Sequence, residues 1–532
     1  EHDLANGPGI VSFISASSFI NGDAFLGMRQ HMRRLCDEIW VIDLGGEGRG
    51  TWRDDNVFAI QTPVAITIAV RYGDAKPKTP AKTHYARIGG ARAAKLQKLE
   101  NLQSFAGLDF EDCPKAWGAP FRPEGKGDYF AWLLLKDLMP WQHSGAQAKR
   151  TWPIGPTKKV LSERWRQLLS TPDRAEAFRE SSDRTVAGEY PQFHPSNTDM
   201  TPIDALNPSA ECPVPQPYGF RSFDRQFIIA DGRLLSRPRS QLWQVYSGNQ
   251  FYFASLFTQA LGNGPALTVS AEVPDLHFFR GSFGAKNILP LYRDKSARQA
   301  NLHPGLLPAL VARYGTALTP EDFAAYLYGL LAQPAFTTRF YKELASRELR
   351  LPLTLDGALF KKLAGVGREL LYLHTCGERF AAGRSWPAPK VKCLKAVPAG
   401  RLPENFSYDE THKVVRVDKG EFGPVDIGVW EYEVSGLKVV QSWLGYRMRQ
   451  RKGKKSSPLD EITPAEWTGE YTSEFLQLLN LLTRTLALHP KQAALLEAVL
   501  NGPLLLADEL PPVRPQWRKA PISNGAQDKL DL

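Results

Sequence analysis

Three apolar segments of strand length within the first 71 residues constrain the fold of this chain more than any other feature. They are residues 9–15, 39–44 and 64–71, and a helix-spaced pattern over about 23–35 separates the first two. Apolar strands that alternate with a helix are typical of an α/β sheet. Because these strands are nearly continuous in their hydrophobicity, helices should cover both faces of the sheet. Three strands do not complete such a domain, so we expect this sheet to lack its other half.

The rest of the chain changes composition several times, and 532 residues are too many for one core. Within it, residues 217–239 predict a hairpin that turns at Asp231-Gly232. Near the end, helices are expected at about 463–488 and 490–501. We predict six segments: the sheet over 1–78, a linker and helical connection over 79–118, a mixed α/β region over 119–300, a helical region over 301–385, a β-rich segment over 386–435, and a basic loop with helices over 436–532.

Membrane, secretory and disulfide-rich classes are disfavoured. No apolar run approaches the ~20 residues that span a bilayer, and the first twenty residues lack the basic start of a signal peptide. The five cysteines are widely spaced, with no C-x-x-C or paired Cys/His pattern, so neither a disulfide scaffold nor a metal site is predicted. A cytoplasmic location is expected. The start without Met suggests that the chain is part of something longer.

Positive charge is concentrated in two stretches. Residues 143–168 contain six basic side chains and one acid, Glu163, and residues 438–455 contain seven basic side chains and no acid. Such stretches suit phosphate contacts, and interleaved aromatics can stack on bases. Either stretch alone is equally well explained as a solvated basic face, but two together favour nucleic acid. The interleaved aromatics are Trp152, Trp165, Trp443 and Tyr446.

No complete active site is visible. The chain has no G-x-x-x-x-G-K-[ST], no G-x-G-x-x-G between strand and helix, no G-x-S-x-G and no H-E-x-x-H. His374 lies near Cys376 at a predicted helix end. A histidine that interacts with the helix dipole is favoured there over a ligand or catalytic group.

The ordered segments GIVSFISASSFINGDAFLGMRQHM, EIWVIDLGG and DDNVFAIQTPVAITIAV resemble the second half of an N6-adenine DNA methyltransferase of the γ arrangement. Later stretches, including SGAQAKRTWPIG, YGFRSFDRQF and VWEYEVSGLKVVQSWLGYRMRQR, resemble the carboxyl-terminal specificity region of type ISP restriction–modification methyltransferases. The resemblance extends from about residue 9 to 500. It implies the C-terminal portion of a Rossmann-like methyltransferase sheet over 1–78, followed by a mixed α+β target-recognition domain and a helical tail.

The resemblance also implies a role for Phe58. In the family, the aromatic residue of this segment packs against the flipped adenine, and the alternative for Phe58 is plain core packing. The glycine motif that binds S-adenosylmethionine and the catalytic N-P-P-[YFW] motif are missing. This chain alone is therefore expected to transfer no methyl group, and the donor is expected to be bound mainly by a missing N-terminal methyltransferase half, in the same parent chain or in a separate subunit.

We therefore expect the DNA-recognition and adenine-binding portion of a site-specific adenine methyltransferase in a restriction–modification or phage-defence system. The alternative is a non-catalytic DNA-binding specificity subunit that docks on a separate methyltransferase. The partner in both cases is double-stranded DNA, with no membrane involved. Arg221 could instead pair with Asp224 inside the fold. Backbone contacts are expected from Lys149, Arg150, Lys158, Lys159, Arg447, Arg449, Arg451 and Lys452, and base contacts from Arg221, Arg225, Arg237 and Arg239.

Overall fold

The computed structural model describes residues 7–46, 55–58, 60, 62–73, 79–123, 127–257, 261–281, 284–344, 346–451, 453 and 456–521. The chain forms two units, Glu1–Phe130 and Ala131–Leu532. Each unit has buried apolar residues of its own. Within the described residues, no helix combines the length and the apolar character needed to cross a bilayer.

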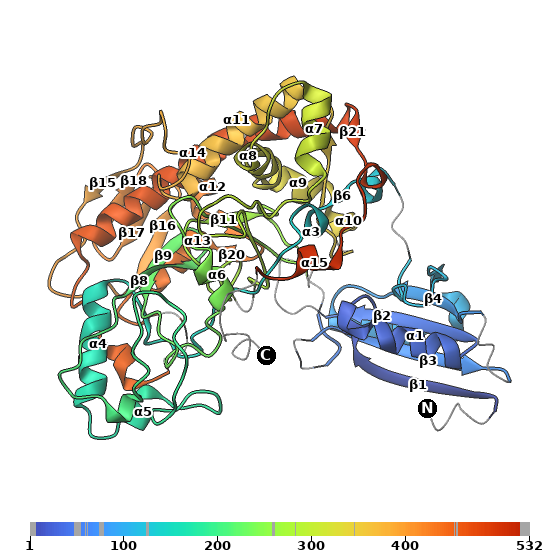
Figure 1. The fold of residues 1–532 in the computed structure, drawn as a ribbon, viewed down its shortest axis with the longest axis horizontal. Helices are drawn as coiled ribbons and strands as arrows, with labels where there is room; N and C mark the ends of the chain where they lie inside the picture. Colours follow the sequence, from blue (N-terminus) through green and yellow to red (C-terminus); the bar gives the residue numbers. More distant parts are fainter. Residues whose placement is uncertain are drawn as a thin grey trace. The chain divides into compact units, whose positions relative to one another are not determined.

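The first unit contains a five-stranded sheet in the order β1-β3-β2-β4-β5 (Figure 1). β3 lies antiparallel between β1 and β2, and β4 runs parallel to β2. The segment 79–118 therefore adds two strands to the sheet and is more than the expected connection; the polar sequence KTHYAR of β4 conceals a strand that pairs along its whole length. The elements are β1 (Gly9–Ala16), α1 (Leu26–Leu35), β2 (Glu38–Gly45), β3 (Val64–Arg71), β4 (Lys82–Arg87), α2 (Arg92–Glu100) and β5 (Glu111–Asp112).

Helices cover both faces of this sheet, as its apolar strands predict. On one face, Met32 of α1 packs with Ile39 and Val41 of β2. On the other face, Leu99 of α2 packs with Ile42. Successive residues of β2 thus contribute to two separate cores, which explains why the strand lacks a polar–apolar alternation.

β1 differs from the other long strands because part of its surface is bare. Among the described strands it pairs only with β3. Val11 faces the core that α1 covers, whereas Ile10 and Ile14 point to the opposite face and are 71% and 51% exposed. A long edge strand with exposed isoleucines is a surface on which another strand or domain can pack.

The second unit combines small antiparallel sheets with a helical core (Figure 1). Its larger described sheets have the orders β7-β9-β8, β11-β10-β12 and β15-β18-β17-β16. The last of these lies in the segment 386–435 that the sequence predicts to be β-rich. The strands are β6 (Leu133–Leu134), β7 (Ile154–Gly155), β8 (Gln216–Arg221), β9 (Asp224–Ile228), β10 (Tyr252–Ser255), β11 (Thr268–Ser270), β12 (Asn287–Pro290), β13 (Arg350–Leu351), β14 (Leu353–Thr354), β15 (Lys392–Lys395), β16 (Phe406–Asp409), β17 (Val414–Val417), β18 (Gly420–Gly423), β19 (Glu433–Val434), β20 (Leu437–Lys438) and β21 (Leu504–Leu505).

The helical core depends on a close approach of α8 and α11. A Cβ atom on Gly367 of α11 would lie 1.7 Å from the carbonyl oxygen of Ala325 on α8, so only glycine fits at this crossing. The helices are α3 (Leu135–Leu138), α4 (Lys158–Ser170), α5 (Arg174–Phe178), α6 (Ser240–Gln244), α7 (Leu306–Tyr314), α8 (Pro320–Leu331), α9 (Pro334–Arg339), α10 (Tyr341–Leu344), α11 (Gly357–His374), α12 (Ile427–Trp430), α13 (Val439–Gly445), α14 (Gly469–Leu500) and α15 (Pro515–Arg518).

The C-terminal helix corrects one prediction. The sequence predicts a break at Pro490. In the structure, α14 is a single helix of 32 residues that continues through this proline. Leu488 and Leu496 are buried on either side of the proline, and the buried Gln492 donates to the carbonyl of Gly329 at 2.7 Å. Packing on both sides of Pro490 outweighs the one backbone hydrogen bond that proline removes.

Candidate nucleic-acid interface

The hairpin that carries Arg221 and Arg225 turns earlier than the sequence predicts. β8 and β9 meet at Ser222-Phe223, where Arg221 stands opposite Asp224, and not at Asp231-Gly232. Asp231 is fully buried and binds Arg233 at 2.6 Å. Its carboxylate neutralises a buried arginine, which explains why this Asp-Gly pair does not join two strands.

Two arginines expected at the DNA lie inside the second unit instead. Arg447 is 2% exposed and donates to both carboxylate oxygens of Asp224, at 2.9 and 3.3 Å. Arg221 pairs inside the fold as well, but its partner is Asp275 at 3.0 Å rather than Asp224. Buried guanidinium groups need such partners, so we assign both side chains to the interior and not to a DNA surface.

Arg150 and Arg451 are also internal. Arg451 binds the buried Asp460 at 2.9 Å. Burial lowers the pKa of Arg150 to about 10, so the side chain still carries its charge at neutral pH. The Nε and Nη2 donors of Arg150 form hydrogen bonds within the fold, which corrects the expectation that it contacts phosphate. Its acceptors are the carbonyls of Phe178, Arg179 and Arg184 and the hydroxyl of Ser181.

Solvent-facing charge is concentrated on one side of α4. Lys158 and Lys159 are exposed in its first turn, and Arg166, which sequence reasoning did not single out, is exposed further along. Arg164 of the same helix is fully buried and donates to backbone carbonyls. Helical spacing could have separated the two arginines, because Arg164 lies one turn before the buried Leu168.

The other expected DNA-binding residues are divided between exposed and partly buried positions. Lys149 and Arg449 are exposed but paired, with Asp183 at 3.0 Å and Glu404 at 2.7 Å respectively. Arg237 is exposed, and Arg239 is half-buried in a left-handed backbone conformation with φ of 58°. Lys452 lies outside the described residues.

Lys158 lies over the ring of Phe227, and Arg225 lies on the same side of β9 as that ring. The Lys158 ammonium lies 5.6 Å from the ring centroid of Phe227. Phe227 and Arg225 are two residues apart on β9 and therefore share one side of the strand. We call Lys158, Phe227 and Arg225 the β9 strip. Cations and aromatic rings are the kinds of group with which proteins contact phosphates and bases. The strand alternation of Arg225 and Phe227 was the signal that could have identified the ring.

Arg225 is held at the end of this strip by two carboxylates. Its guanidinium lies 2.5 Å from Glu378 and 3.9 Å from Glu272, and its side chain remains 38% exposed. Burial, and then the nearby Glu378, raises the pKa of Glu272 to about 7. The carboxylates fix the orientation of Arg225 while part of its fork of donors stays accessible.

Phe58 projects to solvent from the first unit. It is 44% exposed, whereas its neighbours Asn56 and Val57 are 9% and 6% exposed. The Phe58 backbone N–H donates to the Asn56 side-chain oxygen at 2.9 Å. Plain core packing therefore describes Val57 and not Phe58.

The loop that carries Phe58 lies at a defined edge of the sheet. Val64, the first residue of β3, pairs with Ala16 at the end of β1 and with Gly45 at the end of β2. The loop before β3 thus lies beside the carboxyl ends of two parallel strands. In α/β sheets, ligands bind at this edge.

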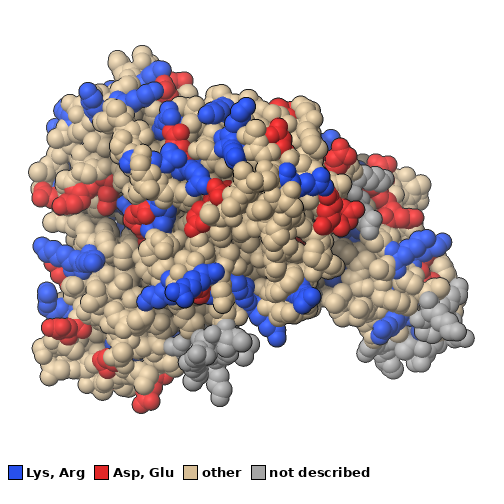
Figure 2. Space-filling view, turned by 45° about the horizontal axis from the view of Figure 1, so that its top comes forward, with Lys and Arg blue, Asp and Glu red and all other residues tan. Residues whose placement is uncertain are grey.

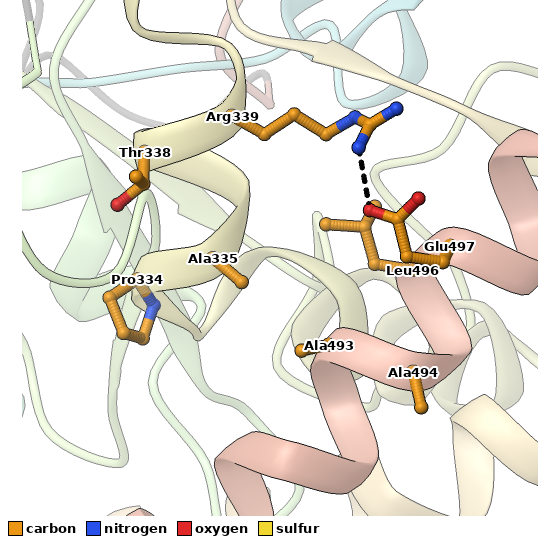
Figure 3. A pocket seen from close by; sticks show the side chains of 8 residues that line it. All are labelled: Pro334, Ala335, Thr338, Arg339, Ala493, Ala494, Leu496 and Glu497. Carbon is orange, nitrogen blue, oxygen red and sulfur yellow. Dashed lines mark hydrogen bonds and ion pairs between the residues drawn. The ribbon is translucent and has the colours of Figure 1, made fainter.

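A shallow hollow lies between α9 and α14 (Figure 3), and its lining provides neither an unpaired cation nor an aromatic ring for a nucleic acid. Its charged side chains, Arg339 and Glu497, bind each other at 2.7 Å. The remaining lining is small or apolar apart from one hydroxyl: Pro334, Ala335, Thr338, Ala493, Ala494 and Leu496.

His374 has a structural role. It is 6% exposed, and its two ring nitrogens lie 2.6 Å from the Tyr328 hydroxyl and 2.8 Å from that of Thr485. Burial lowers the pKa of His374 to about 3, so the ring is neutral and the expected charge–dipole interaction at the helix end is wrong. In the described parts of the chain, no group of three or more His, Cys, Asp or Glu residues is arranged to hold a metal ion.

Positive and negative charges are mixed on the face drawn in Figure 2, where Lys and Arg side chains lie interspersed with Asp and Glu. This face therefore offers local groups of positive charge and no uniform basic surface.

Comparisons with known proteins match this organisation. A family model, Type ISP C-terminal specificity domain, matches residues 137–478. The chain also resembles three solved structures: a DrdV–DNA complex (19% identity, TM-score 0.61, 93% of this chain and 50% of that chain), the ATP-dependent Type ISP restriction-modification enzyme LlaBIII bound to DNA (18%, 0.63, 94% and 33%), and a nuclease-deletion mutant of the Type ISP restriction-modification enzyme LlaGI in complex with a DNA substrate mimic (16%, 0.59, 91% and 39%).

No curated protein matches the chain. The chain spans half or less of the length of each of the three solved chains. At these identities the likeness shows a shared fold.

Proposed function

The chain belongs to the family of Type ISP C-terminal specificity domains, and on this premise we propose that it recognises double-stranded DNA and binds the target base for a site-specific N6-adenine DNA methyltransferase of a restriction–modification or phage-defence system. The family match supports the recognition part of this proposal. The solved structures with similar folds are complexes with DNA or a DNA mimic, which agrees with it.

The exposure of Phe58 carries the base-binding part. An aromatic ring at the carboxyl-end edge of an α/β sheet, with both preceding residues buried, is held outward by the structure of its loop. A base that leaves the duplex loses its stacking partners, and an aromatic side chain can replace them. Phe58 would supply that face.

In the second unit, some exposed cations would contact phosphates and others would contact base edges. Lys158 and Lys159 are placed to contact phosphates, and such contacts position a protein without reading sequence. Arg225, oriented by Glu378, and the exposed Arg237 would reach base edges. Arginine engages guanine through two parallel hydrogen bonds, which requires a fixed guanidinium plane.

The bare edge of β1 supports a missing methyltransferase half. A strand added beside β1 would pair with the edge that no described strand occupies, and it would help to cover Ile10 and Ile14. This edge serves equally for a preceding part of the same polypeptide and for a separate subunit. In the second arrangement, this chain would be a non-catalytic specificity subunit that docks on a methyltransferase.

The methyl donor of such an enzyme would be S-adenosylmethionine, which supplies the methyl group. The described residues of this chain do not fit the donor. The turn directly after β1, Ser17–Phe19, contains no glycine, and Ser17 is 3% exposed and donates its N–H to the Pro63 carbonyl. This chain would bind and orient the base, and its partner half would hold the donor.

The test is formation of N6-methyladenine in unmethylated genomic DNA by the native protein purified from its host, measured by mass spectrometry. Genomic DNA removes the need to know the target sequence. We expect Phe58→Ala to lower kcat/KM by tenfold or more, because base–aromatic stacking contributes about 1–3 kcal/mol. Phe58→Tyr should keep activity within a few-fold, and Tyr72→Ala, which removes another exposed aromatic ring of the first unit, should be neutral.

Two outcomes would overturn the proposal. One is a native protein that binds DNA but forms no methyladenine with the donor present. The other is a Phe58→Ala variant as active as the wild type. Copurification of a separate methyltransferase subunit would select the specificity-subunit arrangement.

A further inference from the structure

A buried lysine lies directly behind the Phe58 loop. Lys95 of α2 is 0% exposed, and its ammonium donates to the carbonyl of Leu44 at 2.5 Å and to the carbonyl of Asp55 at 2.7 Å. Leu44 belongs to the end of β2, and Asp55 lies three residues before Phe58 in the connection between β2 and β3. One side chain thus connects the rim of the sheet to the segment that carries Phe58.

A second set of bonds fastens the same loop from the other side. The Asn56 amide donates to the carbonyls of Gly46 at 3.3 Å and Thr62 at 2.7 Å. Gly46 has a φ of 95°, and a Cβ atom there would lie 2.7 Å from Asn56. The backbone is therefore shaped to let the Asn56 side chain fill the space inside the loop.

The ring of Phe58 points outward from a segment that is held on its other residues. Lys95 binds Asp55, Asn56 and Val57 are buried, and Phe58 is 44% exposed. α2 is tied to the loop through its backbone as well, because the Arg92 N–H donates to the Asp55 carboxylate at 3.2 Å. α2 and the segment that carries Phe58 are therefore connected by hydrogen bonds from both a side chain and the backbone of the helix.

Burying an ammonium group is expensive unless its donors are satisfied. An apolar residue at position 95 would fill the same space at lower cost if packing were the only requirement. Lys98, on the exposed side of α2, shows that the helix itself does not require a buried lysine. The Lys95 ammonium binds the Leu44 and Asp55 carbonyls, and it thereby connects the end of β2 to the segment that carries Phe58.

We propose that Lys95 is a positioning residue for the target-base site, which holds the Phe58 loop in the geometry that receives the flipped base. This inference rests on the proposed function of Phe58. The segment 79–118 would then be part of the recognition machinery. Misplacement of a contact group by 1 Å is enough to lower turnover, so the effect of Lys95 should fall on kcat and not on DNA affinity.

The experiment is a double-mutant cycle on methyladenine formation by the native protein, with Lys95→Met, Phe58→Ala and the combination. Lys95→Met should lower kcat about tenfold and leave the Kd for DNA within twofold. In the Phe58→Ala background it should change kcat by less than twofold, because there is no ring left to position. Lys98→Met is the matched control and should be neutral.

A purely structural role would give a different pattern. Lys95→Met would then add its full loss on top of Phe58→Ala, and that additivity would overturn the inference, as would wild-type kcat in Lys95→Met. Failure of Phe58→Ala itself to lower activity would instead overturn the proposed function. If Lys95→Met does not fold, Lys95→Gln, which keeps an amide donor, enters the same cycle with the same expectations.

Discussion

The two basic stretches, residues 143–168 and 438–455, look alike in sequence and differ in the structure. The first keeps Lys158 and Lys159 in solvent on α4. In the second, Arg447 is buried against Asp224, and Arg451 is partly buried and pairs with the buried Asp460. The difference teaches that a count of positive charge does not predict exposure. A planar guanidinium with five donors can be satisfied inside a fold, whereas the ammonium of lysine is more strongly hydrated.

The second stretch also supports the first. The Thr151 hydroxyl donates to Asp460 at 2.7 Å, and Asp460 in turn binds Arg451. The Arg164 guanidinium donates to the Ile462 carbonyl at 3.0 Å. We infer that the first stretch presents the surface that meets DNA, and that the second stretch and the segment after it hold that surface in place.

The largest effect should come from breaking the Arg447–Asp224 pair. Arg447→Met leaves a buried, uncompensated carboxylate, which costs about 3–5 kcal/mol of the free energy of unfolding. Urea denaturation of the second unit measures it. Arg449→Met, two residues further on and exposed, is the matched control and should stay within about 0.5 kcal/mol. Equal stability of both variants would mean that Arg447 is not the internal connection described here.

A second test uses two arginines of α4. Arg164→Met removes three hydrogen bonds to backbone carbonyls and should lower the free energy of unfolding by about 2–3 kcal/mol. Arg166→Met, on the exposed side, should leave stability unchanged. Thermal melts monitored by circular dichroism compare the two. Similar losses in both variants would show that burial does not divide the basic residues of this stretch.

Much of the fold could be predicted from local pattern. The three apolar strands of the first unit and the cover on both of its faces follow from periodicity. β4 could not be found in this way, because its strand character comes from pairing with β2 and its sequence is polar. The register of the β8–β9 hairpin was missed for a related reason, since Asp231 accepts hydrogen bonds from Gln192 and Asn197, which lie more than 30 residues away in sequence.

The candidate sites divide in the same manner. The family pattern singled out Phe58, and the structure adds that the ring is exposed at the carboxyl-end edge of the sheet. Lys95 was out of reach, because a buried lysine and an exposed one look identical in a helix until the packing is known. The partner of Arg221 could not be predicted either, because Asp275, whose carboxylate binds it, lies 54 residues away in sequence.

Acidification provides a third test, of the contact between the two basic stretches. Burial alone would raise the pKa of Asp460, but hydrogen bonds from Thr151 and Ser456 and the charges of Arg451 and Arg164 lower it below its ordinary value. A lowered folded-state pKa gives stability that is present above the unfolded-state value, near 4, and is lost as pH falls through the folded-state value.

Asp460→Asn should therefore cost about 1–2 kcal/mol at pH 7. The difference from the wild type should begin to shrink below about pH 4, where the carboxylate of the unfolded chain takes up a proton, and it should keep shrinking until the folded-state carboxylate is protonated at a lower pH. Urea denaturation at pH 7, 5 and 3.5 measures this change. A difference that stays constant down to pH 3.5 would show that the charge of Asp460 does not hold the stretches together.

The smallest expected effect bears most directly on the comparison, because it asks which stretch meets DNA. Lys158→Ala/Lys159→Ala should weaken binding of duplex DNA about tenfold at 0.1 M salt, and it should reduce the dependence of log Kobs on log salt by up to about 1.8, since each phosphate contact contributes about 0.9. Fluorescence anisotropy with random-sequence duplex measures both quantities. Stability should not change, because both side chains are exposed.

Arg449→Ala provides the opposing control in the second stretch. Arg449 is exposed but paired with Glu404, so its removal uncovers an acid as it deletes a base. If the second stretch only supports the first, the Kd of Arg449→Ala for duplex DNA should stay within twofold of the wild-type value. The slope of log Kobs against log salt should not change. If Arg449→Ala weakens binding as much as the double lysine variant, both stretches contact DNA and exposure alone decides which basic residues take part. If only Arg449→Ala weakens it, the roles assigned to the two stretches are reversed.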